Sequence, residues 1–484
     1  MSIAVPVEIS KSEFENFREL AENAFQTAMQ FGRELIRLTL EAKDEELRDA
    51  RDKRRYRCKG KRRTCVKTKL GEVEFERYVY EDKAVTDGIR HVYLLDEELS
   101  IDKVGLMAAD MCHLIAGMAC ENSYRGAAKA ISEATGQSIS PQGVWDVVQE
   151  LGEQRRKQIE RHVELNKAGQ GTGLVESKIL YEENDGIWLK MQGEDRKKYG
   201  TSKEMKVGIA YDGATWSGGK DGKSRRTLDC KVAHASFEQA KAFHESKEGI
   251  IASRFNTEKI EQRVTNGDGA GWVQQSAGKN NISMLDPFHR NKKMRECVKD
   301  PEIIKKLQEL LYSGKISDLL DCLEAYSNSV ESEDEKDGLQ ELLTYYRENK
   351  DALTSCYDRG IEIPETREPG VIHHARLGSM ESNVFTLIGN RMKDRRACWS
   401  VSGGENLANL LCLRHTTGFE DLYNLPPLPV PEDEAETDTG SPLSASRVPE
   451  TVGKGNECYK RANLLNLPFL KAITGFVSFC NLRL

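Results

Sequence analysis

Five short apolar segments that run into an aspartate or a glycine most constrain the fold of this chain. They lie between residues 174 and 289, and a helical pattern over residues 237–255 separates the first three from the last two. Short apolar runs that alternate with a helix are typical of strands in an α/β sheet. The sequence therefore predicts an α/β sheet domain that begins at about residue 171.

Other patterns surround this domain. Residues 9–55 have apolar side chains at spacings of three and four, which predicts one long amphipathic helix. The segment TKLGEVEFERYVY that follows predicts a short hairpin with basic side chains. The next segment fits a helix–turn–helix. It has a predicted helix from Ser123 to Glu133, a break at Thr135-Gly136 and a second helix that begins at Ser140-Pro141. Two ordinary packed helices fit the same pattern.

Charge is distributed unevenly along the 484 residues. The net charge is −7, yet the segment from Arg51 to Lys69 holds eleven lysines or arginines and one acid, Asp52. Such a local excess matters more for nucleic-acid binding than the total charge does. No secretory signal pattern and no uninterrupted apolar run of about 18 residues is found, since Lys471 interrupts the apolar segment near the C-terminus. We therefore expect a cytoplasmic protein that does not span a membrane.

Three acids stand out by their sequence context. Asp185 lies in ENDGIWLK beside strand-forming residues, and Asp268 lies between glycines in TNGDGAGW, where the backbone can turn sharply. Glu381 lies in GSMESNVFTLIGNRMK, where Ser379 is expected to cap a helix with an apolar stripe. Carboxylates that converge from two strands and a helix suit Mg²⁺ or Mn²⁺, and two such ions can activate both oxygens of a phosphodiester exchange.

Other candidates for the site are less constrained. Asp286 and His289 stand three residues apart directly after a strand pattern, as in a phosphate-orienting pair or simply a turn with a surface histidine. Asp212, in AYDGATW, also ends a strand and is the alternative to Asp185 as the first acid. The neighbouring residues His373 and His374 point in different directions on a strand or a helix, which favours hydrogen bonding over shared metal ligation.

The order of these motifs resembles the DDE transposases of ISLre-type insertion sequences, whose catalytic core is RNase H-like and distantly similar to the Mutator superfamily. The resemblance runs from the first helix to about His415, and its most specific motifs are ENDGIWLKMQ, NGDGAGW, LDPFH and GSMESNVFTLIGNRMKDRRACWS. It implies that Asp185, Asp268 and Glu381 are catalytic and hold two Mg²⁺ or Mn²⁺ ions. Asp286 and His289 match an acid-x-x-His element of related transposases.

The resemblance also implies a domain organisation, in which the core is split by a helical insertion between Asp268 and Glu381. The expected parts are a DNA-binding helix and hairpin (1–100), a helix–turn–helix-like region (101–170), an RNase H-like core (171–291 and 371–424), a helical insertion (292–370), an acidic linker (425–455) and an apolar C-terminal segment (456–484).

The implied activity is metal-dependent cleavage at transposon ends, followed by attack of the freed 3′-OH on target DNA. We expect a nucleoid-associated homo-oligomer on DNA. Basic side chains are expected to bind phosphates by charge and not by sequence. These are Arg54, Arg55, Lys61, Arg62, Arg63, Arg391, Lys393, Arg395 and Arg396. The alternatives are a catalytically retired, transposase-derived DNA-binding protein and an RNase H-like nuclease.

Overall fold

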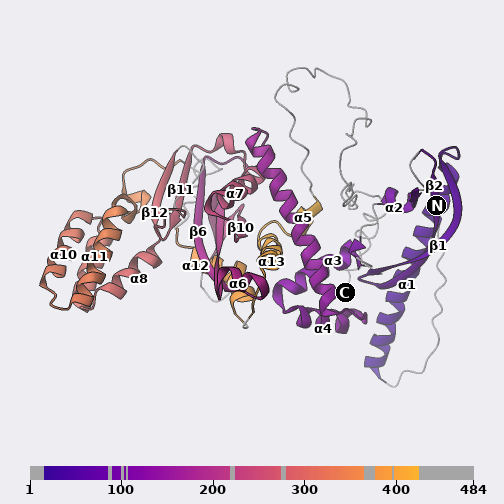
Figure 1. The fold of residues 1–484 in the computed structure, drawn as a ribbon, viewed down its shortest axis with the longest axis horizontal. Helices are drawn as coiled ribbons and strands as arrows, with labels where there is room; N and C mark the ends of the chain where they lie inside the picture. Colours follow the sequence, from indigo (N-terminus) through magenta and orange to yellow (C-terminus); the bar gives the residue numbers. More distant parts are fainter. Residues whose placement is uncertain are drawn as a thin grey trace, which may run out of the picture. The chain divides into compact units, whose positions relative to one another are not determined.

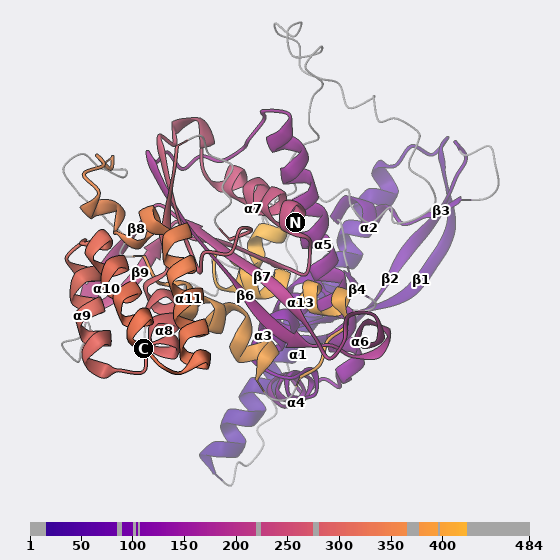
Figure 2. The same ribbon diagram turned by 60° about the vertical axis from the view of Figure 1, so that its left-hand side comes forward.

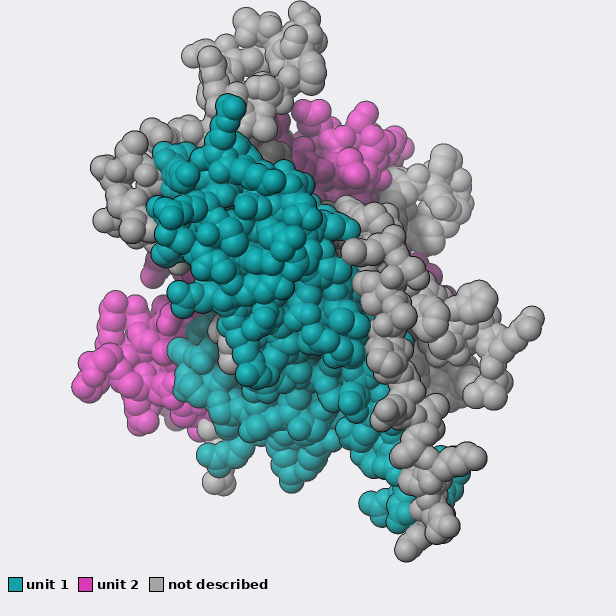
Figure 3. All heavy atoms as spheres, turned by 90° about the vertical axis from the view of Figure 1, so that its right-hand side faces the viewer, with its two compact units in different colours: residues 1–151, 440–484 teal, residues 152–439 magenta. Residues whose placement is uncertain are grey.

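The computed structural model describes residues 16–84, 90–99, 103–104, 107–218, 224–273, 280–364, 377–394 and 397–423. The chain divides into two compact units. Residues 1–151 and 440–484 form the first unit, and residues 152–439 form the second (Figure 3). The expected linker at 425–455 and the apolar segment at 456–484 lie outside the described residues.

The first unit is built on a long helix and a long hairpin. Helix α1 (Phe17–Ala50) packs against strand β2 (Gly71–Asp82), which pairs antiparallel with β1 (Tyr56–Thr68). Alternate side chains of β2, such as Val73 and Phe75, are buried against Ile36 and Leu40 of the helix. The helix ends before the predicted residue 55 and the hairpin is longer than predicted, because the backbone turns after Ala50 and places most of the basic segment on β1.

The remaining elements of this unit complete a small sheet and add helices. The sheet has the order β3-β2-β1-β5-β4, with β3 at Arg90–Val92, β4 at Lys103–Val104 and β5 at Met107–Ala108. The helices are α2 (Leu94–Leu99), α3 (Ala109–Glu121), α4 (Tyr124–Thr135) and the first part of α5 (Pro141–Lys167), which belongs to the second unit from Gly152 onward.

The two predicted helix starts are confirmed. Ser140 Oγ accepts a hydrogen bond from the Gly143 N–H at 3.0 Å, and Pro141 is the first helical residue of α5. Helix α4 ends at Gly136, whose φ of +68° lies in the left-handed region that glycine adopts without strain.

The second unit contains a five-stranded mixed sheet of order β10-β7-β6-β11-β12 (Figure 1). Strands β6, β7 and β10 form an antiparallel series, and β11 and β12 add parallel to β6 on its other side. Their bounds are Ile179–Lys190 for β6, Ser202–Tyr211 for β7, Val232–Ser236 for β10, Gln262–Gly267 for β11 and Asn281–Leu285 for β12. The predicted mixed α/β class is confirmed.

Helices cover both faces of this sheet. One face carries Leu180 and Ala210, which pack with residues of α5 and of α7 (Ala240–Arg254). Helix α12 (Met380–Val384) lies on β6 and continues into a π-helical segment, Phe385–Lys393. Helix α13 (Val401–Arg414) packs on that segment and on β10. Smaller elements are α6 (Gly193–Tyr199), the ribbon of β8 (Gly213–Gly218) and β9 (Ser224–Asp229), and short 3-10 turns at Thr257–Lys259 and Phe419–Tyr423.

A group of helices follows β12 and has its own core (Figures 1 and 2). It consists of α8 (Pro287–Cys297), α9 (Pro301–Tyr312), α10 (Ile316–Ser329) and α11 (Glu333–Glu348), followed by 3-10 turns at Lys350–Leu353 and Cys356–Asp358. Leucines 307, 319, 323, 339 and 342 are fully buried among these helices. None of the helices in the described ranges is long and apolar enough to cross a membrane.

Candidate metal site at the edge of the sheet

Three aspartates stand at the same level on three neighbouring parallel strands. In the register of β6 and β11, Asn266 lies opposite Glu183, so Asp268 follows the strand at the level of Asp185. In the register of β11 and β12, Gly267 lies opposite Leu285, so Asp286 comes directly after that pair. Neighbouring strands are about 4.8 Å apart. The pairing of the strands therefore brings the three acids to the same level, at the edge of the sheet where β11 and β12 end.

Asp286 begins helix α8 and thereby sets the position of His289. Its side chain is buried, and its Oδ2 accepts the His289 N–H at 3.2 Å as the helix cap. Its Oδ1 accepts a hydrogen bond from Asn266 Nδ2, also at 3.2 Å. Both carboxylate oxygens are engaged in these contacts, so in this structure Asp286 holds the helix and orients His289.

His289, Asp185 and Glu381 come together at this edge. The His289 Nε2 lies 3.5 Å from the Asp185 Oδ2, and each of the three residues offers a ligand atom within 4.8 Å of the other two. The hydrogen bond to Asp185 and its charge raise the pKa of His289 above its usual value, against the opposing effect of burial. Asp185 and His289 are partly buried, whereas Glu381 is exposed. This arrangement could hold a divalent ion.

Asp268 is adjacent to this group without being part of it. Its Oδ1 accepts the N–H of Ala270 at 2.9 Å within a tight turn, and Gly269 has a φ of +93° there. Its carbonyl oxygen accepts a hydrogen bond from the Tyr345 hydroxyl of α11 at 2.6 Å. The helical segment thus holds the backbone of Asp268 in place.

Glu183 connects β6 to the helix that carries Glu381. Its carboxylate accepts the backbone N–H of Gly378 at 2.9 Å and of Ser379 at 3.1 and 3.2 Å. Ser379 stands at the expected N-cap position of α12, but its side chain makes no capping hydrogen bond. The buried carboxylate of Glu183 takes that role. Orphan N–H groups at a helix start need an acceptor, and here the acceptor comes from a distant strand.

Glu183 also accepts hydrogen bonds from two side chains of the same sheet. It accepts a hydrogen bond from the Tyr211 hydroxyl at 2.7 Å and one from Asn266 Nδ2 at 2.8 Å. Burial raises the pKa of this carboxyl, and the hydrogen bonds from Tyr211 and Asn266 oppose that shift. Glu183 was not among the site residues predicted from the sequence. A signal was present, because two consecutive glutamates inside an apolar strand point to opposite faces and both need partners.

Asp212, the alternative first acid, lies elsewhere in the unit. It follows β7, whose Tyr211 is paired with Tyr181 near the start of β6, four residues before Asp185. Tyr211 donates to Glu183 on the face that carries α12, so Asp212 belongs to the opposite face. Asp212 is fully buried and is not one of the residues grouped with His289. The geometry favours Asp185.

Comparisons with known proteins identify a family for this chain. Residues 11–420 match the model of an uncharacterised protein family, UPF0236. The chain belongs to the UPF0236 family.

Several curated relatives of this UPF0236 chain come from one bacterium. A UPF0236 protein of Caldanaerobacter subterraneus subsp. tengcongensis is 23% identical over 398 residues, which are 81% of this chain and 79% of the relative. Its name joins eleven locus numbers of that genome. A second relative from the same organism is 22% identical over 398 residues, which are 81% of this chain and 79% of the relative. Its name joins four locus numbers.

A further relative belongs to Streptococcus gallolyticus. This UPF0236 protein, named for its place in the vanSb 3′ region, is 20% identical over 363 residues, or 73% of each chain. The three relatives are therefore similar to this chain over most of their length.

The basic residues of the hairpin in this UPF0236 chain fall into two groups. Arg55 forms an ion pair with Asp82 at 2.9 Å, Lys61 with Glu45 at 2.9 Å, and Arg63 with Glu74. Arg54 and Arg62 are exposed, and neither forms an ion pair with a carboxylate in the described part of the chain. Among the five basic residues of the hairpin that are predicted to bind phosphates, these two are the most available.

The second basic cluster is only partly described. Lys393 is exposed, whereas Arg391 is 7% exposed and its guanidinium lies 5.3 Å from the ring centroid of Trp399. Arg391 is therefore not accessible to a phosphate in this structure. Arg395 and Arg396 lie outside the described residues, as do His373 and His374.

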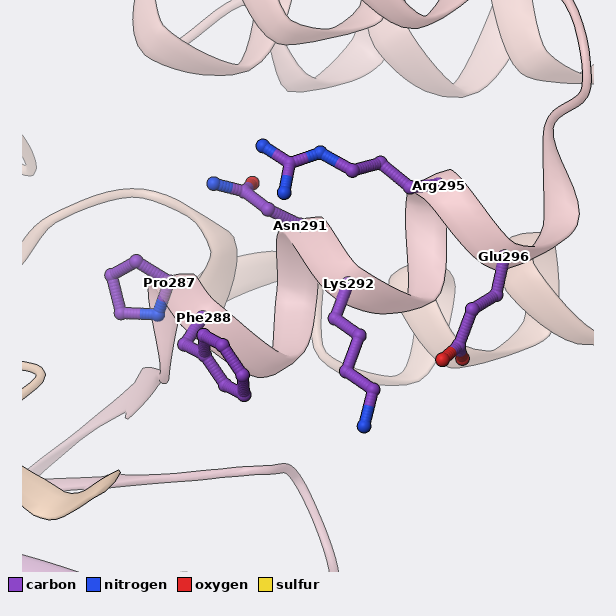
Figure 4. A pocket seen from close by; sticks show the side chains of 6 residues that line it. All are labelled: Pro287, Phe288, Asn291, Lys292, Arg295 and Glu296. Atoms are coloured by element: carbon purple, nitrogen blue, oxygen red, sulfur yellow. The ribbon is translucent and has the colours of Figure 1, made fainter. Parts of the chain in front are cut away.

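Helix α8 carries further polar and aromatic side chains beyond His289. A hollow of about 410 Å³ on this helix is lined by Pro287, Phe288, Asn291, Lys292, Arg295 and Glu296. Phe288 and Lys292 extend from the same side of the helix (Figure 4). Phe288 is 49% exposed. An exposed aromatic ring next to a cation is a surface on which a nucleic-acid base can stack.

Proposed function

We propose that this chain is a DDE transposase of an insertion sequence, of the ISLre type, which cleaves and joins DNA strands with two Mg²⁺ or Mn²⁺ ions. One observation carries the proposal. The ligand atoms of Asp185, His289 and Glu381 lie within 4.8 Å of one another, and Asp268 stands at the level of Asp185 on the adjacent strand. These residues come from two strands and two helices far apart in the sequence.

The topology of the second unit supports an RNase H-like core. In such a core, three antiparallel strands are followed by a helix and two strands that add parallel to the first. The order β10-β7-β6-β11-β12, with α7 between β10 and β11, has this arrangement. The locations of the acids also support the proposal, since Asp185 lies on the central strand, Asp268 directly follows β11, and Glu381 lies on a helix after the helical segment.

The donor set fits the proposed ions. Carboxylate oxygens are the preferred ligands of Mg²⁺ and Mn²⁺, and Asp185, Asp268 and Glu381 supply them. When bound there, two ions would activate the attacking oxygen and stabilise the leaving oxygen. We assign His289, whose Nε2 lies 3.5 Å from the Asp185 Oδ2, the task of contacting the scissile phosphate beside the ions.

The chemistry consists of two exchanges at phosphorus. Water attacks a phosphodiester at the transposon end, one P–O bond forms and one breaks, and a 3′-OH is released. That 3′-OH then attacks a phosphodiester of the target. A bond forms between the transposon 3′-oxygen and this phosphorus, the bond from the phosphorus to the target 3′-oxygen breaks, and the target strand leaves with a free 3′-OH. Both steps need the same negative charge stabilised on a phosphate, which is why one set of acids serves both.

The names of the relatives support a mobile element. Eleven loci of one genome share one relative's name and four share another's. Such multiplicity is expected of a gene that carries its own means of copying. We infer accordingly that the protein works on chromosomal DNA inside the cell, as a homo-oligomer bound to the ends of its element.

The test uses the purified full chain and DNA that carries both genomic flanks of its gene. With Mg²⁺ or Mn²⁺ we expect cleaved ends and strands joined to a second plasmid, and neither product from the Asp185→Asn variant. Cleavage without joining would indicate an RNase H-like nuclease instead. Binding of DNA without either reaction would indicate a retired, DNA-binding descendant of a transposase.

A further inference from the structure

A basic cavity lies beside the helix that carries Glu381. It has a volume of about 680 Å³ and is lined by residues of β9, of the turn before β10, of the end of α7 and of α12. Ser379, Ser382 and Asn383 line it, and their spacing of three and four places them on one side of the helix. Glu381 lies on the other side, because successive helical residues turn by about 100°.

The charge of the cavity lining is unusual for this chain. Four of the lining residues, Arg226, Lys231, Arg254 and His415, carry basic side chains, and none is an aspartate or a glutamate. The protein as a whole has 78 acidic residues and 71 lysines and arginines, so an acid-free, basic lining is not expected from composition. Most other lining residues are serines and threonines, which donate hydrogen bonds. The lining is suited to an anion.

Lys231 is the central cation of this cavity. Its Nζ donates a hydrogen bond to Asn383 Oδ1 at 3.2 Å, and it forms no ion pair with a carboxylate in the ranges that the structure describes. Burial lowers the pKa of Lys231, which reflects the cost of a charge held away from water without a partner of opposite sign. Arg254, at the end of α7, also has no carboxylate partner among the described residues.

Ser379 supplies a second, independent sign of a ligand. The residue is 5% exposed and lines the cavity, and its Oγ has no hydrogen-bond partner within the described chain. A buried hydroxyl without a partner is destabilising, and a bound molecule that accepts from it or donates to it would remove that cost. The N–H of the same residue donates to Glu183. Ser379 therefore connects the cavity to the support of the Glu381 helix.

We propose that this cavity binds a backbone phosphate of the DNA strand next to the cleavage site, through Lys231, Arg254 and the Ser379 hydroxyl. The inference rests on the proposed function. A helix is about 10 Å across, so a phosphate on the far side of α12 lies within a few nucleotides of one held at Glu381. Binding there secures the strand and the catalytic helix at once.

The test compares Lys231→Gln and Ser379→Ala with Lys259→Gln, which removes an exposed lysine of the same unit that makes no ion pair in the described chain. Binding of a labelled duplex from the gene's flank is measured by fluorescence anisotropy over a range of salt, without a cleavage-supporting metal. Loss of one phosphate contact should lower the slope of log affinity against log salt by about 0.9 for Lys231→Gln. We expect a several-fold weaker affinity and an unchanged slope for Ser379→Ala, and no change for Lys259→Gln.

The outcomes separate this inference from the proposed function. If the wild type cleaves DNA and both cavity variants bind and cleave like Lys259→Gln, the cavity assignment is overturned and the transposase proposal stands. If the wild type neither binds nor cleaves DNA, both fail. In that case a rise in melting temperature with inorganic phosphate, lost in Lys231→Gln, would assign the cavity to a free phosphate compound and overturn its role in DNA binding.

Discussion

The backbone N–H of Ser379 donates to both carboxylate oxygens of Glu183, at 3.2 and 3.1 Å. This contact joins the central strand to helix α12, which begins one residue before Glu381. Because the acceptor is buried and also holds Tyr211 and Asn266, the helix start cannot shift without breaking several hydrogen bonds. The position of Glu381 relative to Asp185 thus depends on a residue that does not itself reach the site.

Glu183→Gln is expected to loosen this support. The amide can accept with one oxygen only, and its NH₂ would face N–H donors, so at least one buried group is left unsatisfied at about 1–3 kcal/mol. We expect a lower free energy of unfolding and a higher Mg²⁺ concentration for half-maximal cleavage. Chemical denaturation and metal titration measure the two effects, with the exposed Glu176→Gln as control. An unchanged metal requirement would show that Glu183 has only a structural role.

Loss of any one of the three proposed metal-binding carboxylates is expected to abolish strand transfer. Asp185→Ala, Asp268→Ala and Glu381→Ala should each abolish strand transfer in Mg²⁺, while folding and DNA binding remain, because removing a negative charge does not weaken attraction to phosphates. Strand transfer and DNA binding are measured on the same preparations. Wild-type strand transfer by the Asp185→Ala variant would move the first acid to Asp212.

His289→Ala should slow cleavage without raising the Mg²⁺ concentration required. The reason is that three carboxylates suffice as ligands, and the imidazole acts on the phosphate. Its Nε2 nevertheless lies 3.5 Å from Asp185 Oδ2, close enough for both to contact one ion. Cleavage rates at a series of Mg²⁺ concentrations distinguish the two roles. A large increase in the requirement would make His289 a metal ligand and refute the assignment.

The exposed arginines of the hairpin should account for the salt-dependent part of its DNA binding. Changing both Arg54 and Arg62 to Gln should reduce the slope of log affinity against log salt by about 0.9 for each lost phosphate contact. The pair Arg55→Gln and Arg63→Gln is the matched comparison, since Asp82 and Glu74 already neutralise these two side chains. A smaller reduction is expected there. Equal slopes for wild type and both double variants would place DNA binding outside the hairpin.

His162 should make stability depend on pH. Burial in helix α5, together with the nearby charge of Arg155, lowers the pKa of His162 to about 4. The unfolded chain, with a pKa of about 6.5, takes up the proton first, so stability is present above pH 6.5 and is lost as the pH falls toward 4. The loss is up to about 3 kcal/mol by linkage.

Urea unfolding at pH 7 and pH 4.5 measures this dependence. The His162→Gln variant should show a smaller loss between the two pH values than the wild type. The exposed His91→Gln should behave like the wild type. If His162→Gln and the wild type lose equal stability, the acid sensitivity comes from other groups.

Local sequence patterns were enough to predict many of the strands, turns and helix starts of this protein. The strand that contains Asp185, the turn at Asp268 and the helix starts at Ser123 and Ser140 follow from alternation, glycine and capping residues. These features depend on hydrogen bonds between residues close in sequence, and a pattern of a few residues is enough to specify them. The mixed α/β class follows from the same patterns.

Contacts between distant residues were decided only by the tertiary structure. The pairing of β6, β11 and β12 brings Asp185, Asp268 and Asp286 to one level, and Glu183 replaces Ser379 as the acceptor at the start of α12. Likewise, burial of Arg391 against Trp399 removes a cation that the sequence left exposed. Composition and spacing cannot predict these outcomes, because the partner of a buried charge is chosen by strand register and packing across hundreds of residues.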